Sequence, residues 1–171
     1  MGLNITAYKD VTILPKEDAE MFTDVGLSYI EVEVDTFAKR DLLHDYLDRR
    51  YKGVINISTS EEGERFYMGT YSSFNNFKNS ICEVLFGVNI DDFRGIDYEH
   101  EPLYHFINFS DCEGCIGASM SGEIYRSLIE NKEKYMKWAT KQEFSSPEDV
   151  YEDLIKAFNI SKEEGIVIFN Q

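Results

Sequence analysis

The segment from Phe106 to Gly122 has the densest set of chemically capable residues in the sequence. It reads Phe-Ile-Asn-Phe-Ser-Asp-Cys-Glu-Gly-Cys-Ile-Gly-Ala-Ser-Met-Ser-Gly. Glycines allow a backbone to approach a ligand closely, and the free N–H groups at a helix N-terminus attract anions. Carboxylates can orient a sugar hydroxyl or act as a base, and hydroxyls can donate hydrogen bonds. The segment therefore predicts a ligand pocket lined by Asn108, Ser110, Asp111, Glu113, Gly114, Gly117, Ser119 and Ser121.

A capped loop that binds no ligand accounts for the same residue types. Asp111 fits an Asx turn, the glycines fit positive φ angles, and the serines fit helix caps. The residues alone leave both interpretations open.

A second segment, from Gly69 to Lys78, also leads from a strand into a helix N-terminus. It reads Gly-Thr-Tyr-Ser-Ser-Phe-Asn-Asn-Phe-Lys, with Ser72 or Ser73 as the expected N-cap. The candidate ligand-binding residues here are Tyr71, Ser72, Asn75 and Lys78. Tyr71 would stack on a ring, and Lys78, expected to be partly exposed, would neutralise an anion. The alternative is a plain helix cap with core aromatic residues.

Both helix N-termini carry more polar residues than one cap requires. We expect the two termini, at Ser72–Asn75 and Gly117–Ser121, to share one site, with a subunit interface as one possible place for it.

Residues His100, His105, Cys112 and Cys115 form a possible zinc set. A Cys-x-x-Cys pair suits two thiolates on a tetrahedral metal, but the histidine spacing is wide and no second cysteine pair exists. We therefore predict no structural zinc and no cofactor. The zincin, deaminase, EF-hand, Walker and Rossmann patterns are also missing from the sequence.

Hydrophobic spacing outlines the elements that would position these segments. A period of two predicts strands near residues 3–8, 11–14 and 30–34, and a polar turn predicts a hairpin between strands 54–58 and 65–71. Helical spacing and caps predict helices over 36–51, from 72 to a stop at Gly87, and near 103–107. A long helix is expected to begin in the Gly- and Ser-rich stretch 112–122 and to end at about Ala139, and a last helix begins at Ser146-Pro147. Residues 91–101 form an expected acidic loop, and 166–169 a last strand. This mixed order favours one compact α+β domain over residues 1–171, with a mixed or antiparallel sheet and about four helices.

Composition narrows the function classes. The 171 residues carry 32 acidic and 17 basic side chains, a net charge of −15, so nucleic-acid and anionic-membrane partners are disfavoured. No apolar run has the length of a membrane span, and three cysteines without a secretory signal favour a reducing, cytoplasmic location. A formal N-myristoylation pattern through Gly2 fits better as the start of a first strand.

Three segments together resemble a family of small uncharacterised bacteriophage and prophage proteins. They are Gly2-Leu-Asn-Ile-Thr-Ala-Tyr8, Gly69-Thr-Tyr-Ser-Ser-Phe-Asn75 and Ile107-Asn-Phe-Ser-Asp-Cys-Glu-Gly114 with Ile116-Gly117. The chain departs from the family pattern at Asn4, where aspartate is usual, and at Cys115, where an apolar residue is usual. The resemblance implies a phage origin and no particular activity.

Three functions remain open at this level. The leading hypothesis is a non-enzymatic, homo-oligomeric binder that sequesters a small nucleotide-like host defence signal. A hydrolase using Asp111 and Glu113 is the second. The third is an acidic interaction protein that mimics DNA or blocks a host protein.

Overall fold

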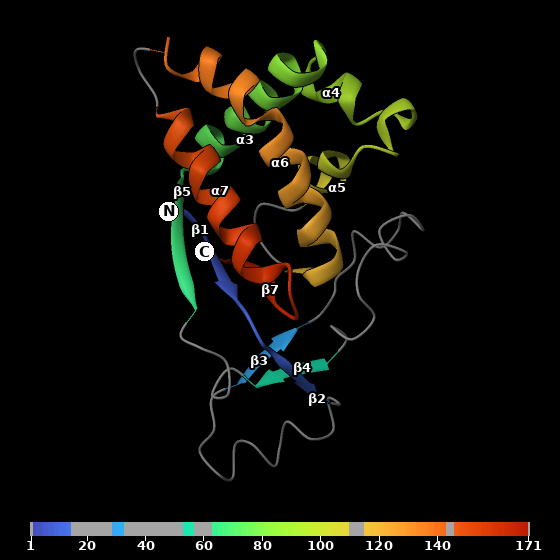
Figure 1. Cartoon of the computed structure of the whole chain (residues 1–171), viewed down its shortest axis with the longest axis vertical. Coiled ribbons are helices and arrows are strands. Elements are labelled where there is room, and N and C mark those ends of the chain that lie inside the picture. The colour runs from blue at the N-terminus through green and yellow to red at the C-terminus, as the bar shows by residue number, and fades with distance from the viewer. Residues whose placement is uncertain are drawn as a thin grey trace.

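The computed structural model describes residues 2–14, 29–32, 53–56, 63–109, 115–142 and 146–170. The expected helix over 36–51 lies outside these ranges, as do residues 110–114 of the first candidate segment. In the described part, an antiparallel four-stranded sheet carries a layer of helices (Figure 1), which confirms the α+β class. The strands, in the order β5-β1-β7-β6, are Glu64–Gly69, Leu3–Tyr8, Ile166–Asn170 and Cys115–Gly117.

Strand β1 lies inside the sheet, between β5 and β7. Its alternating residues Leu3, Ile5 and Ala7 are at most 1% exposed, as their period of two predicts. Ile166 and Val167 of β7 are fully buried beside it. The two inner strands therefore contribute to the core, together with Phe66 and Met68 of β5 and Ile116 of β6.

A second, smaller antiparallel sheet has the strand order β2-β4-β3. It consists of Thr12–Leu14, Gly53–Asn56 and Tyr29–Val32. The expected hairpin between strands 54–58 and 65–71 is therefore wrong. Strand β4 pairs with β2 and β3, whereas β5 pairs with β1 in the larger sheet, where it covers an otherwise open edge of a buried strand.

The first helix of the described residues is α3, and its π-helical extension η4 ends at Gly87 in the left-handed conformation, as predicted. The expected acidic loop instead contains two short helical elements, because the Asn89 side chain accepts a hydrogen bond from Asp92 N and caps the first of them. The elements are α3 Tyr71–Ile81, η4 Cys82–Phe86, α4 Ile90–Phe93, η5 Ile96–Tyr98, α5 Pro102–Asn108, α6 Ala118–Ala139 and α7 Pro147–Ser161.

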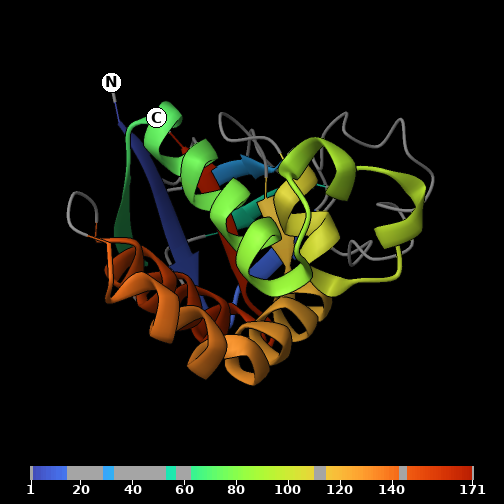
Figure 2. The same cartoon turned by 90° about the horizontal axis from the view of Figure 1, so that it is seen from above.

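Helices α6 and α7 lie side by side on one face of the larger sheet and run in opposite directions (Figures 1 and 2). Helix α7 packs on β1, β5 and β7, and α6 contacts β6 and β7. Gly165 links α7 to β7 at a point where a Cβ atom would collide with the Tyr8 carbonyl and the Ser161 backbone. In the described ranges, no helix has the length and apolar character needed to cross a bilayer.

Aromatic rings join the helices into one core. Phe77 of α3 meets Tyr135 of α6 at 5.9 Å between ring centroids, and Tyr135 stacks on Tyr151 of α7 at 4.3 Å. Phe106 of α5 contacts Phe158 of α7 edge to face, at 5.9 Å between ring centroids. These contacts hold α3 across the helix pair, so one face of α3 is buried and the other stays available for a site.

Candidate functional site

The two predicted helix N-termini lie at opposite corners of the four-stranded sheet. Strand β5 ends at Gly69, which pairs with Leu3 at the start of β1. Strand β6 ends at Gly117, which pairs with Ile166, and Ile166 pairs with Tyr8 at the end of β1. Strands β5 and β6 are also the two edges of the sheet.

This register sets the distance between the two termini. The six residues of β1 span roughly 17 Å, and three strand spacings add about 14 Å across the sheet, so the termini are roughly 20 Å apart. The expectation that they share one site is therefore wrong within a single chain. A site formed across a subunit interface stays a prediction.

Lys78 is buried, with 1% of its surface exposed, so the expectation of a partly exposed lysine is wrong. Its Nζ donates hydrogen bonds to the carbonyl oxygens of Phe109, at 2.9 Å, and Ile107, at 3.4 Å. It also lies 5.3 Å from the Phe74 ring centroid and 5.7 Å from that of Phe106. Carbonyl groups at a helix C-terminus attract cations, so Lys78 stabilises the end of α5.

The structure describes some of the remaining candidate residues of the first segment. Asn108 is half-buried and donates from Nδ2 to Tyr104 O at 2.9 Å. Gly117 is buried with an extended φ of −78°, Ser119 is exposed, and Ser121 is fully buried with no hydrogen-bond partner for its Oγ among the described residues. Outside the described residues lie Ser110, Asp111, Glu113 and Gly114. The prediction that this segment lines a pocket thus stays a prediction.

The proposed zinc ligands that the structure describes have different environments. The His100 side chain is 75% exposed and its Nε2 lies 3.3 Å from Glu101 Oε1. His105 is buried, and burial lowers its pKa to about 4. Cys115 is also buried, and burial raises the pKa of its thiol to about 12. Because Cys112 lies outside the described ranges, the absence of zinc stays a prediction.

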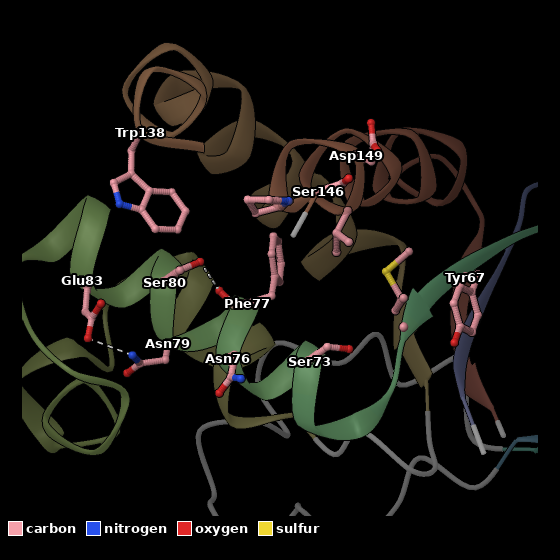
Figure 3. A pocket seen from close by; sticks show the side chains of 14 residues that line it. Tyr67, Ser73, Asn76, Phe77, Asn79, Ser80, Glu83, Trp138, Ser146 and Asp149 are labelled. Atoms are coloured by element: carbon pink, nitrogen blue, oxygen red, sulfur yellow. Dashed lines mark hydrogen bonds between the residues drawn. The ribbon is translucent and has the colours of Figure 1, made fainter. Parts of the chain in front are cut away.

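A groove of about 690 Å³ lies between α3, the end of α6, the start of α7 and the end of β5 (Figure 3). Residues Ser73, Asn76, Ser80 and Glu83 line its α3 side. Their spacing of three or four residues places them along one face of the helix. Local sequence patterns did not predict this groove.

The start of α3 is fixed by Thr70 and not by the expected Ser72 or Ser73. The Thr70 side chain accepts a hydrogen bond from Ser73 N at 3.1 Å, and Ser73 Oγ donates to Thr70 O at 2.8 Å. Gly69, at φ +88°, turns the chain from β5 into the helix, and a Cβ atom there would lie 2.5 Å from Ser73 Oγ. This turn brings the end of β5 against the first turn of α3 and closes one end of the groove.

Three aromatic side chains line the groove at different places. Trp138, in the last turn of α6, lies at one end, and Tyr67 of β5, 62% exposed, lies at the other (Figure 3). Phe77 lies between them and is nearly buried. These side chains offer flat apolar surfaces on which a ring can stack.

A buried polar contact lies beneath the middle of the groove. Ser80 Oγ donates to Phe77 O at 2.7 Å and lies 2.7 Å from the hydroxyl oxygen of Tyr135. Burial raises the pKa of Tyr135 to about 12, so its phenol is neutral at physiological pH. The floor of the groove therefore adds no charge.

The charged side chains of the groove wall are both acidic, namely Glu83 and Asp149. Asn79 Nδ2 donates to Glu83 Oε1 at 2.9 Å, and Asn79 Oδ1 accepts from Ile90 N at 2.9 Å, so the Glu83 carboxylate is held in place. No lysine, arginine or histidine is among the described residues that line the groove. Its charge therefore favours neutral or positively charged ligands.

Two serine side chains of the groove are held by hydrogen bonds to neighbouring residues. Ser73 and Ser80 form hydrogen bonds with Thr70, Phe77 and Tyr135, and in the described part of the chain neither is bonded to a histidine or a carboxylate. A serine nucleophile requires such a base to remove its proton.

Two α3 residues that line the groove are each one position further along the helix than the residues predicted from the sequence. Ser73 and Asn76 line it, whereas the predicted neighbours Ser72 and Asn75 are exposed residues of α3 outside its lining. The spacing of Ser73, Asn76, Ser80 and Glu83 was a sequence signal for a polar stripe, but nothing local indicates that Trp138 and Tyr67 flank it.

No protein-family model, curated protein or solved structure matches this chain.

Proposed function

We propose that the protein is a non-enzymatic small-molecule-binding protein and that its ligand occupies the groove along α3. The observation that carries this proposal is the groove itself, at about 690 Å³ with aromatic and neutral polar walls. Ligand sites in proteins commonly have volumes of roughly 300–1,000 Å³, apolar or aromatic surfaces and a few placed polar groups.

The lining favours one part of a nucleotide-like ligand. A base or a similar ring can stack on Trp138 or Tyr67, and Ser73, Asn76 and Ser146 can bond the hydroxyls of a sugar. Phosphates have no cationic partner in this lining. We therefore propose a nucleoside-sized ligand without a requirement for phosphate.

The biological role that we propose is sequestration of a nucleotide-derived host signal. Its support is the resemblance of three sequence segments to phage proteins together with a groove of suitable size. A cytoplasmic location and a homo-oligomeric state belong to the same proposal. The net charge of −15 favours a second candidate, an acidic protein that occupies a basic surface of a host factor.

Two matched variants test the site. In Asn76→Arg a long side chain enters the groove, whereas Asn75→Arg places the same side chain on the neighbouring exposed position outside it. Each purified protein is incubated with the small-molecule fraction of a host extract, desalted and denatured, and the released compounds are identified by mass spectrometry. We expect the wild type and Asn75→Arg to release the same unaltered compound, and Asn76→Arg to release little.

Equal release from the two variants would contradict a ligand site in this groove. Loss of the compound only in Asn75→Arg would favour the residues predicted from the sequence. A chemically altered compound that accumulates with time would show an enzyme.

A further inference from the structure

We infer that the groove selects a flat, positively charged aromatic ring, which stacks on Trp138 and is neutralised by Glu83. This inference deepens the proposed function and rests on it, because it names the chemical class of the ligand that the groove holds.

Trp138 and Glu83 lie at the same end of the groove, although they come from different elements (Figure 3). Trp138 belongs to the last turn of α6, and Glu83 belongs to η4. The indole packs against the buried Tyr135 at 5.4 Å between ring centroids. Since this contact holds the indole in place, its remaining surface forms a fixed platform at the groove end.

An indole face is the strongest cation–π partner among the protein side chains. A ring that carries its positive charge in the π system gains from stacking and from cation–π attraction at once. Glu83 adds a full negative charge at the same end, and its position is set by Asn79. An aromatic platform and a held carboxylate at the same end of a groove can together recognise an aromatic cation.

The other walls of the groove agree with this selectivity. Asp149, in the first turn of α7, supplies a second negative charge. The β5 wall consists of Tyr67, Met68 and Gly69, which carry no charge. Both charged side chains among the described residues of the lining are therefore negative, which favours a cationic ring over an anionic one.

A pair of nucleosides with the same shape and different charge tests the inference. Nicotinamide riboside has a permanent positive charge on its ring, and benzamide riboside replaces the charged nitrogen with carbon. Trp138 is the only tryptophan in the chain, so its fluorescence reports occupancy of this end directly. Calorimetry on the same samples gives a Kd that does not depend on optical quenching.

We expect nicotinamide riboside to bind about tenfold more tightly than benzamide riboside, which is the scale of a partly desolvated cation–π contact with a nearby carboxylate. Glu83→Gln should remove this preference and leave the affinity for benzamide riboside nearly unchanged. Glu163→Gln makes the same change of charge at an exposed position beyond the far end of α7, and should preserve the preference. Nicotinamide mononucleotide, which adds a phosphate, should bind more weakly than the riboside.

The outcomes separate the two proposals. Equal affinities for the two ribosides, unaffected by Glu83→Gln, would overturn the cation selectivity and leave a groove that binds rings. If neither riboside binds at millimolar concentration, the selectivity is wrong, and the extract experiment with Asn76→Arg decides the small-ligand function separately. Binding of a short peptide of alternating arginine and tyrosine in that case would make the groove a protein-docking surface.

Discussion

Acid should destabilise this protein through His105, a residue of α5 that is only 2% exposed. Burial disfavours the charged imidazolium and lowers its pKa from 6.5 to about 4. The native protein therefore keeps His105 neutral at pH values where the unfolded chain has already taken up a proton.

The sign and size of the effect follow from these two pKa values. Above pH 6.5 neither state is protonated at this residue, and its contribution to stability is fully present. As the pH falls from 6.5 towards 4, the unfolded state binds the additional proton and the free energy of unfolding decreases. The loss of unfolding free energy attributable to His105 is about 2 kcal/mol at pH 5 and roughly 3 kcal/mol at pH 4, because a difference of one pKa unit between the two states corresponds to about 1.4 kcal/mol.

Urea denaturation at pH 7.5 and pH 5.0 measures this loss. The comparison is made between the wild type, His105→Gln and the control His100→Gln, whose histidine side chain is 75% exposed. The acidic side chains titrate in all three proteins, so their contribution cancels when the pH dependences are compared. We expect His105→Gln to lose about 2 kcal/mol less than the wild type between these pH values, whatever its stability at pH 7.5. Equal losses in the wild type and His105→Gln would refute the argument, and so would a native-state His105 pKa near 6.5 by NMR.

The other predictions concern the buried lysine and two cysteines. Lys78→Glu should lower the melting temperature strongly, because a carboxylate would face the carbonyl oxygens of Ile107 and Phe109, whereas Lys78→Met keeps the apolar stem and should cost only roughly 1–3 kcal/mol. Equal melting temperatures for Lys78→Glu and the wild type would mean that Lys78 is not buried in solution. Burial raises the thiol pKa values of Cys82 and Cys115 to about 12, so iodoacetamide at pH 7.5 should label neither residue until urea is added. Peptide mass spectrometry reads the labelling, and rapid modification of either residue in the native protein would contradict this prediction.

The sequence by itself determined the elements whose signals are local. The alternation of Leu3, Ile5 and Ala7 specified a strand, and Gly87 specified the end of a helix. The Ser146-Pro147 start of α7 was also predictable, although the serine side chain makes no capping bond there. Such signals need only the period of a strand or helix and the backbone preferences of a few neighbours, so they can be identified without knowing the fold.

The tertiary structure decided which distant elements meet. Strand β5 pairs with β1 and not with β4, because a partner is chosen by the burial of a whole sheet and not by the turn between two neighbours. Lys78 is buried because its Nζ lies over the rings of Phe74 and Phe106 and donates hydrogen bonds to the end of α5. Neither the pairing of β5 with β1 nor the contact of Lys78 with α5 can be predicted from a local sequence pattern.

The same reason explains the candidate site. A step of one residue on a helix turns a side chain by about 100°, so only the packing of α3 distinguishes Ser73 and Asn76 from Ser72 and Asn75. Trp138 is 65 residues from Ser73 in sequence, and the two line one groove only because the fold brings the end of α6 and the start of α7 to α3. The sequence thus determined that α3 would have a polar face, whereas the tertiary packing decided which face borders the groove.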